Sequence, residues 1–391
     1  MIDSYRIRQD TPPCRNILFL NSAGSSLMPR QVLNKMSEYQ SLEGEVGGYA
    51  AAAMEQHAIS GFYIACAELL NTKKENIAFV YNATDGYSKA VSSIPFNSGD
   101  YILLTDDDYI SNHFLFISLS KRLSINIIRC NNLESGDLDL NDMELKIKKY
   151  KPKLVSVTHI PTNSGKIQPI EEVGVLCKKY DVWYIVDACQ SVGQLPVDVQ
   201  KIKCDFLSAT GRKFLRGPRG TGLLYISDKA LDFGLAPLLI DMEGAVWKDE
   251  DQFTVVQNAK RFELWESNYV NIIGLKEAIL YAQSIGLGNI EQHNSLLVNE
   301  LKYGLYLNKE LILTENGSYS AGIVTFTSKK HSLDQTKSLL NQHKVSYSIG
   351  FRHFALIDFN KKDVDWVIRF SPHYFNTIDE INKVVEILDD L

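Results

Sequence analysis

The sequence lacks a long apolar segment. No stretch approaches the roughly 18 consecutive apolar residues that a helix needs to cross a membrane. The segment Met1–Arg15 carries charges where a signal peptide would need an apolar core. We therefore expect a cytoplasmic protein whose function does not involve a membrane.

Paired cysteines are also missing. The chain has six cysteines, and no two of them form a C-x-x-C pair. Their scattered positions indicate reduced, mostly buried side chains, as is usual in the cytosol. The six positions are Cys14, Cys66, Cys130, Cys177, Cys189 and Cys204.

There is no excess of basic charge either. The net charge is −6 at pH 7, and the densest lysine cluster, Lys148–Lys153, is best explained as the solvated end of a helix. A nucleic-acid partner is therefore not expected. The hydrophobic fraction of 45% and the charged fraction of 23% are typical of a globular protein. A length of 391 residues favours two domains.

The most informative stretch runs from Val182 to Thr221. Its apolar run Val182–Val186 predicts a buried strand that ends on Asp187. A second apolar patch, Asp205–Ser208, leads into Lys213 and a glycine-rich turn. Polar groups at strand ends mark ligand sites in open α/β sheets. Pyridoxal 5'-phosphate (PLP) needs an aspartate at its ring nitrogen and a lysine for its aldehyde, so we expect Asp187 and Lys213 to bind this cofactor.

A second polar segment, Asn82–Gly86, follows a predicted strand at 76–81 and precedes a helix expected over 87–93. A strand-to-helix junction exposes backbone N–H groups and can bind phosphate. Thr84 is accordingly either a helix cap or a phosphate ligand.

Three consecutive acids, Asp106–Asp108, follow a predicted strand at 101–105. No histidine or cysteine lies at ligand spacing from them, so no metal site is expected.

Strands and helices alternate from residue 76 to residue 226. This pattern predicts an α/β fold with a mostly parallel sheet flanked by helices. From about residue 287 the pattern changes to a smaller α+β unit, with helices expected at 292–305, 333–343 and 378–388. Strands are expected there at 322–327, 345–348 and 367–371.

The segments VDACQSVG, DFLSATGRK and GPRGTG resemble the core of the class V aminotransferases. These are fold type I PLP-dependent transferases and related enzymes, including the cysteine desulfurases and isopenicillin N epimerase. The resemblance covers nearly the whole chain and implies a seven-stranded type of sheet. It also implies an N-terminal arm at 1–30, a large PLP-binding domain at 31–286 and a small C-terminal domain at 287–391. A neighbouring subunit completes the family's cofactor pocket, so a homodimer is implied.

The same resemblance implies a set of cofactor contacts. Tyr109 stands where the family stacks an aromatic ring or a histidine on the pyridine ring. Gln190 and Asn163, or Thr162 if the register is shifted by one, would contact the phenolic oxygen of the cofactor. The other expected cofactor contacts are Ala83, Thr84, Thr210 and Arg212.

The implied substrate contacts lie in three separate segments. Arg369 in RFSPHYFNT matches the family's arginine for the substrate α-carboxylate, and a guanidinium suits bidentate binding of a carboxylate. Asn21 and Ala23 lie in a turn that lines the active site in the family. Trp265 lies in the segment that crosses to the partner's cofactor and is expected to shape its substrate pocket.

The reaction type depends on a missing residue. Cysteine desulfurases of this family carry a cysteine on a loop of the C-terminal domain, and the matching region, 346–369, contains none. We therefore expect a C–S lyase that acts by β-elimination on a cysteine-derived amino acid. An aminotransferase or epimerase is the alternative, and a persulfide-forming desulfurase is less favoured. A non-catalytic PLP-binding protein is the least favoured, because Lys213, Asp187 and Arg369 are all present.

Overall fold

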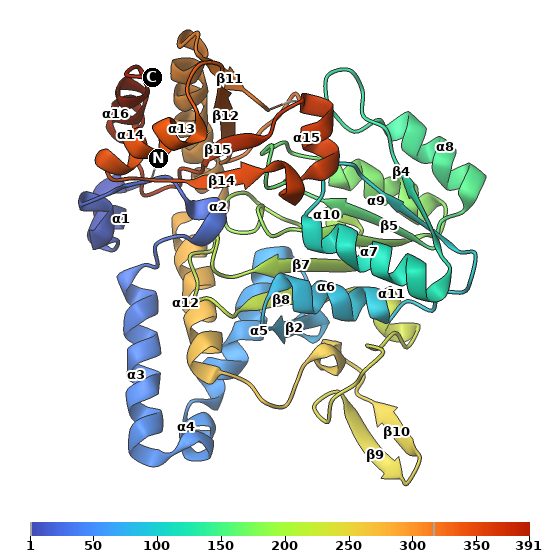
Figure 1. Cartoon of the computed structure of the whole chain (residues 1–391). Coiled ribbons are helices and arrows are strands. Elements are labelled where there is room, and N and C mark those ends of the chain that lie inside the picture. Colours follow the sequence, from blue (N-terminus) through green and yellow to red (C-terminus); the bar gives the residue numbers. More distant parts are fainter. Residues whose placement is uncertain (1, 316) are drawn as a thin grey trace.

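A seven-stranded sheet forms the centre of the computed structural model, which describes residues 2–315 and 317–391 (Figure 1). Met1 of the expected N-terminal arm lies outside the described residues. Neighbouring strands are parallel except at β8, which is antiparallel to both of its neighbours. The predicted α/β fold is therefore confirmed. In spatial order the strands are β2 (Ile77–Val80), β8 (Gly222–Ile226), β7 (Phe206–Thr210), β6 (Trp183–Asp187), β5 (Leu154–Thr158), β3 (Tyr101–Leu104) and β4 (Asn126–Arg129).

Helices cover both faces of this sheet. On β6, Trp183 and Ile185 join one buried cluster, while Tyr184 and Val186 join the other. Because both faces are buried, the inner strands read as continuous apolar runs rather than as alternating patterns. The face that carries Trp183 and Ile185 is covered by α6 (Ala83–Ser92) and α7 (Ile110–Leu123). The opposite face is covered by α5 (Gln56–Leu70), α8 (Leu140–Tyr150), α9 (Ile170–Lys179) and α12 (Tyr269–Ile285).

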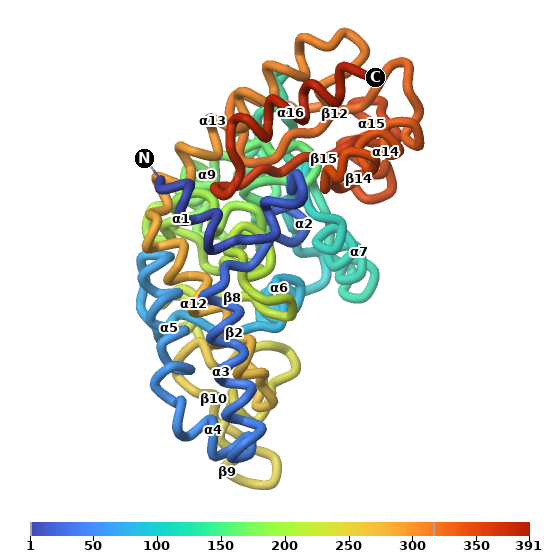
Figure 2. The backbone as a smooth tube through the Cα atoms, turned by 90° about the vertical axis from the view of Figure 1, so that its left-hand side faces the viewer, coloured from blue at the N-terminus to red at the C-terminus, as the bar shows by residue number. Residues whose placement is uncertain are grey.

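The helix α12 packs along α3 (Arg30–Val46) and α5, and Figure 2 shows these helices side by side. A hairpin of β9 (Ala245–Asp249) and β10 (Gln252–Val255) projects from the body at the lower right of Figure 1. This hairpin was not predicted from the sequence. The remaining helices of this part are α1 (Ser4–Gln9), η1 (Pro12–Arg15), α2 (Ser22–Ser25), α4 (Gly48–Met54), η2 (Lys74–Asn76), α10 (Val199–Ile202), α11 (Asp228–Asp232) and η3 (Ala259–Phe262).

Residues 287–391, which we call the small unit, form an antiparallel four-stranded sheet with helices. The N-terminal strand β1 (Leu18–Phe19) pairs in parallel with β13, so the arm joins the small unit. In chain order the elements are α13 (Leu287–Leu307), β11 (Leu311–Leu313), β12 (Val324–Ser328), α14 (Leu333–Gln342), β13 (Val345–Ser346), β14 (Ser348–Phe351), η4 (Arg352–Phe354), α15 (Leu356–Lys362), β15 (Trp366–Phe370) and α16 (Ile378–Leu388). The division of the chain into three domains stays a prediction.

Several expected boundaries were wrong, and the helix expected over 292–305, for example, spans Leu287–Leu307. The helix expected from Tyr87 begins at Ala83, because Asn82 caps it by accepting a hydrogen bond from the backbone N–H of Asp85 at 2.9 Å. Asn82, and not Thr84, is therefore the cap. The strand expected over 345–348 is split, because β13 pairs with β1 whereas β14 pairs with β15.

Among the described residues, no helix combines the length and the apolar character needed to span a bilayer.

Candidate active site

The two residues that first indicated a cofactor lie at adjacent strand ends. Asp187 is the last residue of β6 and is in register with Ser208 on β7, five residues before Lys213. Both side chains line one pocket at this edge of the sheet. Of the residues expected to bind the cofactor, those that line this pocket are Ala83, Thr84, Tyr109, Asp187, Gln190, Thr210, Arg212 and Lys213.

Asp187 is held by two donors and is only 4% exposed. The backbone N–H of Cys189 donates to Oδ1 at 2.9 Å, and the amide of Asn112 donates to Oδ2 at 3.0 Å. The same amide donates to Oδ1 of Asp108 at 2.9 Å. Asn112 and Cys189 also line the pocket, and the sequence did not single out either as a site residue.

Lys213 is buried beside the ring of Tyr109, with its Nζ 5.9 Å from the ring centre. Burial lowers the pKa of Lys213, and the positive charges of Arg212 and Arg369 lower it further, against the opposing effects of Cys189 and Asp187. A lowered pKa increases the fraction of neutral amine, which is the nucleophilic form.

Three cations meet in this region without a carboxylate partner. Within residues 2–315 and 317–391, none of Arg212, Lys213 and Arg369 forms an ion pair. Burial lowers the pKa of Arg369 to about 10, with a further contribution from Arg212. Charges removed from water are normally paired, so this arrangement suits a ligand that carries several negative charges.

A hydrogen-bonded chain connects Arg369 to the pocket through Thr162. Arg369 donates to Oγ1 of Thr162 at 3.1 Å, and the amide of Gln190 donates to the same oxygen at 2.5 Å. The other amide atom of Gln190, Oε1, is buried without a hydrogen-bond partner among the described residues. Thr162 lines the pocket, whereas Asn163 does not. The structure thus brings Thr162, rather than Asn163, to the expected cofactor position.

The N-terminal arm contacts the pocket residue Gln190 through Ala23 rather than through Asn21, and neither Ala23 nor Asn21 lines the pocket itself. The carbonyl of Ala23 accepts a hydrogen bond from the amide of Gln190 at 3.3 Å, and its N–H donates to Oγ of Ser371 at 2.9 Å. Asn21 instead accepts from Oγ of Ser348 at 2.9 Å. Asn21 therefore joins the arm to the small unit and does not line the pocket.

Arg216 anchors the turn after Lys213 to the C-terminal segment. Its guanidinium carbon lies 4.8 Å from the ring centres of both Tyr374 and Phe375, and its Nε donates to the carbonyl of Leu27 at 2.7 Å. Such cation–π contacts are strongest when desolvated. The aromatic residues that follow Arg369 therefore help to fix the turn that carries Lys213.

Trp265 lies away from the pocket of its own chain. Its side chain is 51% exposed and borders a separate pocket with Tyr63 and Glu263. The neighbouring carbonyl of Glu266 accepts a hydrogen bond from the hydroxyl of Tyr81. No residue of the Lys213 pocket contributes to this second pocket.

Comparisons with known proteins agree with this geometry. A family model described as "Aminotransferase class-V" matches residues 18–384. A probable cysteine desulfurase of Pyrococcus abyssi is 29% identical over 98% of this chain and 96% of its own length. The apo structure of a cysteine desulfurase from Thermococcus onnurineus NA1 has a TM-score of 0.91 and 28% identity, covering 100% of this chain and 98% of its own.

A more distant structure shares the fold. It is a complex between the cystine C–S lyase C-DES and its reaction product cysteine persulfide, with a TM-score of 0.84 and 24% identity, covering 97% of this chain and 99% of its own. The family model spans nearly all of the chain, including both Asp187 and Lys213. The chain therefore belongs to the class V aminotransferase family of PLP-dependent enzymes.

Proposed function

We propose that this chain is a PLP-dependent enzyme that acts on cysteine or a cysteine-derived amino acid and breaks its Cβ–S bond by β-elimination. The observation that carries the proposal is the group of unpaired cations around Lys213, placed beside the strand-end carboxylate of Asp187. The cofactor's phosphate and the substrate's carboxylate supply the negative charge that this group lacks. The relatives that are cysteine desulfurases support cysteine as the substrate class.

The residues present fit PLP in several respects. Gln190 lines the pocket with an unpartnered Oε1 and an amide donor, and would offer them to a polar substituent of the ring. The exposed N–H groups at the start of α6, together with Thr84 and Arg212, are suited to a phosphate. Asp187 would hold a proton on the ring nitrogen, and Tyr109 would lie against the ring.

When bound, PLP supplies a carbonyl that condenses with amines and a ring that accepts an electron pair from Cα. Lys213 would hold that carbonyl and, once the substrate amine had replaced it, its free amine would take the proton from Cα. Arg369 would hold the α-carboxylate, and Thr162 would connect it to Gln190 at the cofactor. Lys213 would then give its proton to the departing sulfur as the Cβ–S bond breaks. By taking back the carbonyl it would release the product enamine, whose imine form water would hydrolyse to pyruvate and ammonia.

The positions of the cysteines favour elimination over persulfide transfer. Five of the six are buried, and Cys189 is half-buried at the pocket wall. Burial, reinforced by the charge of Asp187, raises the pKa of the Cys189 thiol well above its ordinary value, against the opposing charge of Lys213. A protonated thiol is a poor nucleophile.

A persulfide-forming desulfurase is the second candidate, because the similar proteins carry that name. In that reaction a protein thiolate takes the sulfur and the amino acid leaves as alanine. Cys189 is the cysteine that this second candidate requires, since it alone among the six borders the pocket.

The test is to incubate the purified holoenzyme with L-cysteine, L-cystine and S-alkyl cysteines and to quantify the products. Pyruvate and ammonia in equal amounts support elimination, whereas alanine supports the desulfurase. Loss of the Cα proton with inversion and no sulfur release would replace both with an epimerase. A half-reaction that leaves the cofactor as its amine would replace them with an aminotransferase.

Lys213 has its own test. Borohydride reduction of the holoenzyme should attach the cofactor to the peptide that contains Lys213. In Lys213→Ala this attachment and the visible absorbance of the lysine-bound cofactor should both disappear. Attachment of the cofactor to Lys166 in the parent protein would overturn the assignment.

We also infer that the active unit is a homodimer. Large apolar side chains are more than half exposed around the β9–β10 hairpin, where a second copy of the chain would cover them: Leu238, Leu239, Met242, Trp247, Phe253 and Trp265. Large apolar side chains left exposed are typical of protein interfaces. Sedimentation of an active monomer at assay concentration would contradict the inference.

A further inference from the structure

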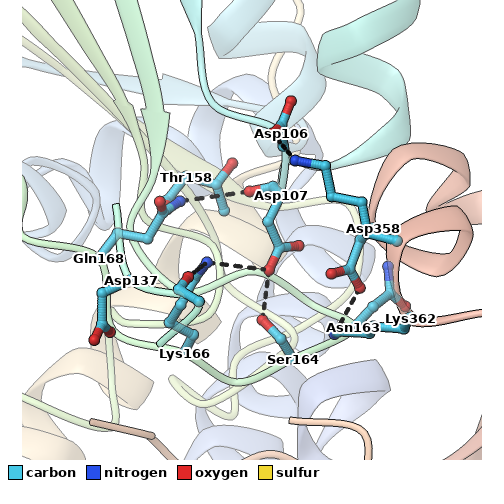
Figure 3. Close-up of polar contacts among 12 residues, drawn as sticks. Asp106, Asp107, Asp137, Thr158, Asn163, Ser164, Lys166, Gln168, Asp358 and Lys362 are labelled. Carbon is cyan, nitrogen blue, oxygen red and sulfur yellow. Dashed lines mark hydrogen bonds and ion pairs between the residues drawn. The ribbon is translucent and has the colours of Figure 1, made fainter. Parts of the chain in front are cut away.

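Three consecutive carboxylates precede Tyr109, and each accepts a hydrogen bond from a different partner. Figure 3 shows two of them, Asp106 and Asp107. Asp108 points inward, where it accepts hydrogen bonds from Thr158 and Asn112. Asp106 and Asp107 are almost as buried, at 8% and 4% exposure. The carboxylates therefore diverge instead of gathering around a common centre.

Asp107 connects the Tyr109 segment to the loop after β5. The hydroxyl of Ser164 donates to Oδ2 of Asp107 at 2.6 Å, and Nζ of Lys166 lies 3.8 Å from the same oxygen. Lys166 is itself 4% exposed. This loop also carries Thr162, so the two segments that present Tyr109 and Thr162 to the pocket are joined to each other behind it.

Asp106 connects the same segment to the small unit. Its carboxylate pairs at 2.6 Å with Lys361 on α15, a residue 255 positions away in the chain. On the adjacent face of α15, Lys362 pairs with Asp358 at 2.8 Å, and Asp358 lies beside Asp107 (Figure 3). The helix α15 is therefore held against the segment that precedes Tyr109.

The helix α15 is also directly connected to the substrate-binding arginine. Only residues 363–365 separate it from β15, which carries Arg369. Arg369 makes its own contact with Thr162, but an incoming carboxylate competes for that guanidinium. The Lys361–Asp106 pair lies outside the pocket, so substrate binding leaves it intact.

We propose that Lys361 and Asp106 are positioning residues, which hold α15 against the Tyr109 segment and so keep Arg369 aligned with the cofactor pocket while substrate enters. This inference rests on the proposed function only for the identity of the substrate. Asp106 is buried whereas the side chain of Lys361 is 57% exposed, so removal of Lys361 leaves a buried carboxylate without its partner.

The experiment compares Lys361→Gln, Asp106→Asn and the double variant in the holoenzyme. The matched control is Lys337→Gln, which breaks a Lys–Asp pair of 2.9 Å within α14 of the same small unit. We expect Lys361→Gln and Asp106→Asn to raise KM by about threefold to tenfold with less than a twofold change in kcat. The double variant should be no worse than the more affected single variant, because both remove one interaction. Lys337→Gln should behave as the parent.

Hydrogen–deuterium exchange gives a readout that does not depend on activity. In both single variants, exchange should become faster in residues 105–112 and in residues 356–362, while the control leaves both segments unchanged. Faster exchange in α15 alone, additive effects in the double variant, or a KM equal to that of the control would each overturn the proposal. A chain that does not cleave C–S bonds would overturn the proposed function but would leave the exchange result unaffected.

Discussion

The side-chain amide of Asn112 lies 3.0 Å from Oδ2 of Asp187. Because this amide also donates to Asp108, it fixes the orientation of the Asp187 carboxylate at the end of β6. A carboxylate that must hold a proton on a cofactor ring needs a fixed direction and a site shielded from water. Asp187 has both, since it is almost fully buried and accepts two hydrogen bonds.

Asp187→Asn should lower kcat by about 10²–10³, because an amide no longer keeps the ring nitrogen protonated. Substrate binding should change little, since Arg369 is intact. Asn112→Ala should give a smaller loss of about tenfold, because the carboxylate remains but turns more freely. Steady-state kinetics with titration of bound cofactor test this, and an equal loss in both variants would contradict the assigned roles.

Arg369→Lys keeps a positive charge but loses the planar pair of donors. Binding of the amino acid should weaken by about 1–3 kcal/mol, the range for hydrogen bonds to a charged group. The absorbance of the bound cofactor should stay as in the parent, because Arg369 contacts Thr162 and does not line the cofactor pocket.

The matched control for Arg369→Lys is Arg352→Lys. Arg352 lies in the same small unit and pairs with Asp365 at 2.9 Å, near the surface. The Arg352→Lys variant should bind the amino acid with the affinity of the parent protein. A change in the cofactor spectrum of Arg369→Lys, with substrate affinity retained, would show that Arg369 serves the cofactor instead.

Because of Asp358, the stability of the packing between α15 and the segment that precedes Tyr109 should depend on pH. Burial raises the pKa of Asp358 to about 7, with a further contribution from the charge of Asp107 that Lys362 offsets only in part. Once α15 is released, the carboxyl returns to a pKa of about 4. The seated helix therefore binds the proton more tightly. The charged groups around Asp358 are Asp106, Asp107, Lys166, Lys361, Lys362 and, beyond Lys362, Glu315.

The contribution of Asp358 to the packing of α15 should accordingly be greatest below about pH 4, fall up to about pH 7 and then stay constant. In Asp358→Asn, which keeps the neutral form, exchange of residues 356–362 at pH 8 should be slower than in the parent. At pH 5 the two proteins should be closer together. A pH-independent difference between the two proteins would refute the role of Asp358.

The sequence was sufficient to predict the sheet and the pair Asp187 and Lys213, because buried parallel strands are apolar throughout and end abruptly in polar residues. It was insufficient to choose between Thr162 and Asn163. Both lie in one loop, and the direction of each side chain depends on tertiary contacts, such as that between Thr162 and Arg369.

Contacts between segments that lie far apart in the chain also could not be predicted from the sequence. The partner of Asp106 is Lys361, and nothing in the local pattern of either residue indicates the other. Asn112 reads as an ordinary residue in the first turn of α7, and its role depends on β6 lying beside it. The three acids before Tyr109 resemble a ligand cluster in sequence because their directions are decided only by the folded backbone.

The last prediction separates elimination from persulfide transfer. If sulfur leaves directly, Cys189→Ser and Cys189→Ala should release sulfur from a cysteine-derived substrate within about threefold of the parent rate, since a small change at the pocket wall alters packing only slightly. Exchange of the Cα proton with solvent should also continue in both variants. Pyruvate, sulfide and Cα exchange are measured together, with Cys130→Ser as the control for loss of a buried thiol away from the pocket. If both Cys189 variants stop sulfur release while Cα exchange continues, the sulfur passes through this thiol, and the enzyme is a desulfurase whose nucleophile lies beside Asp187.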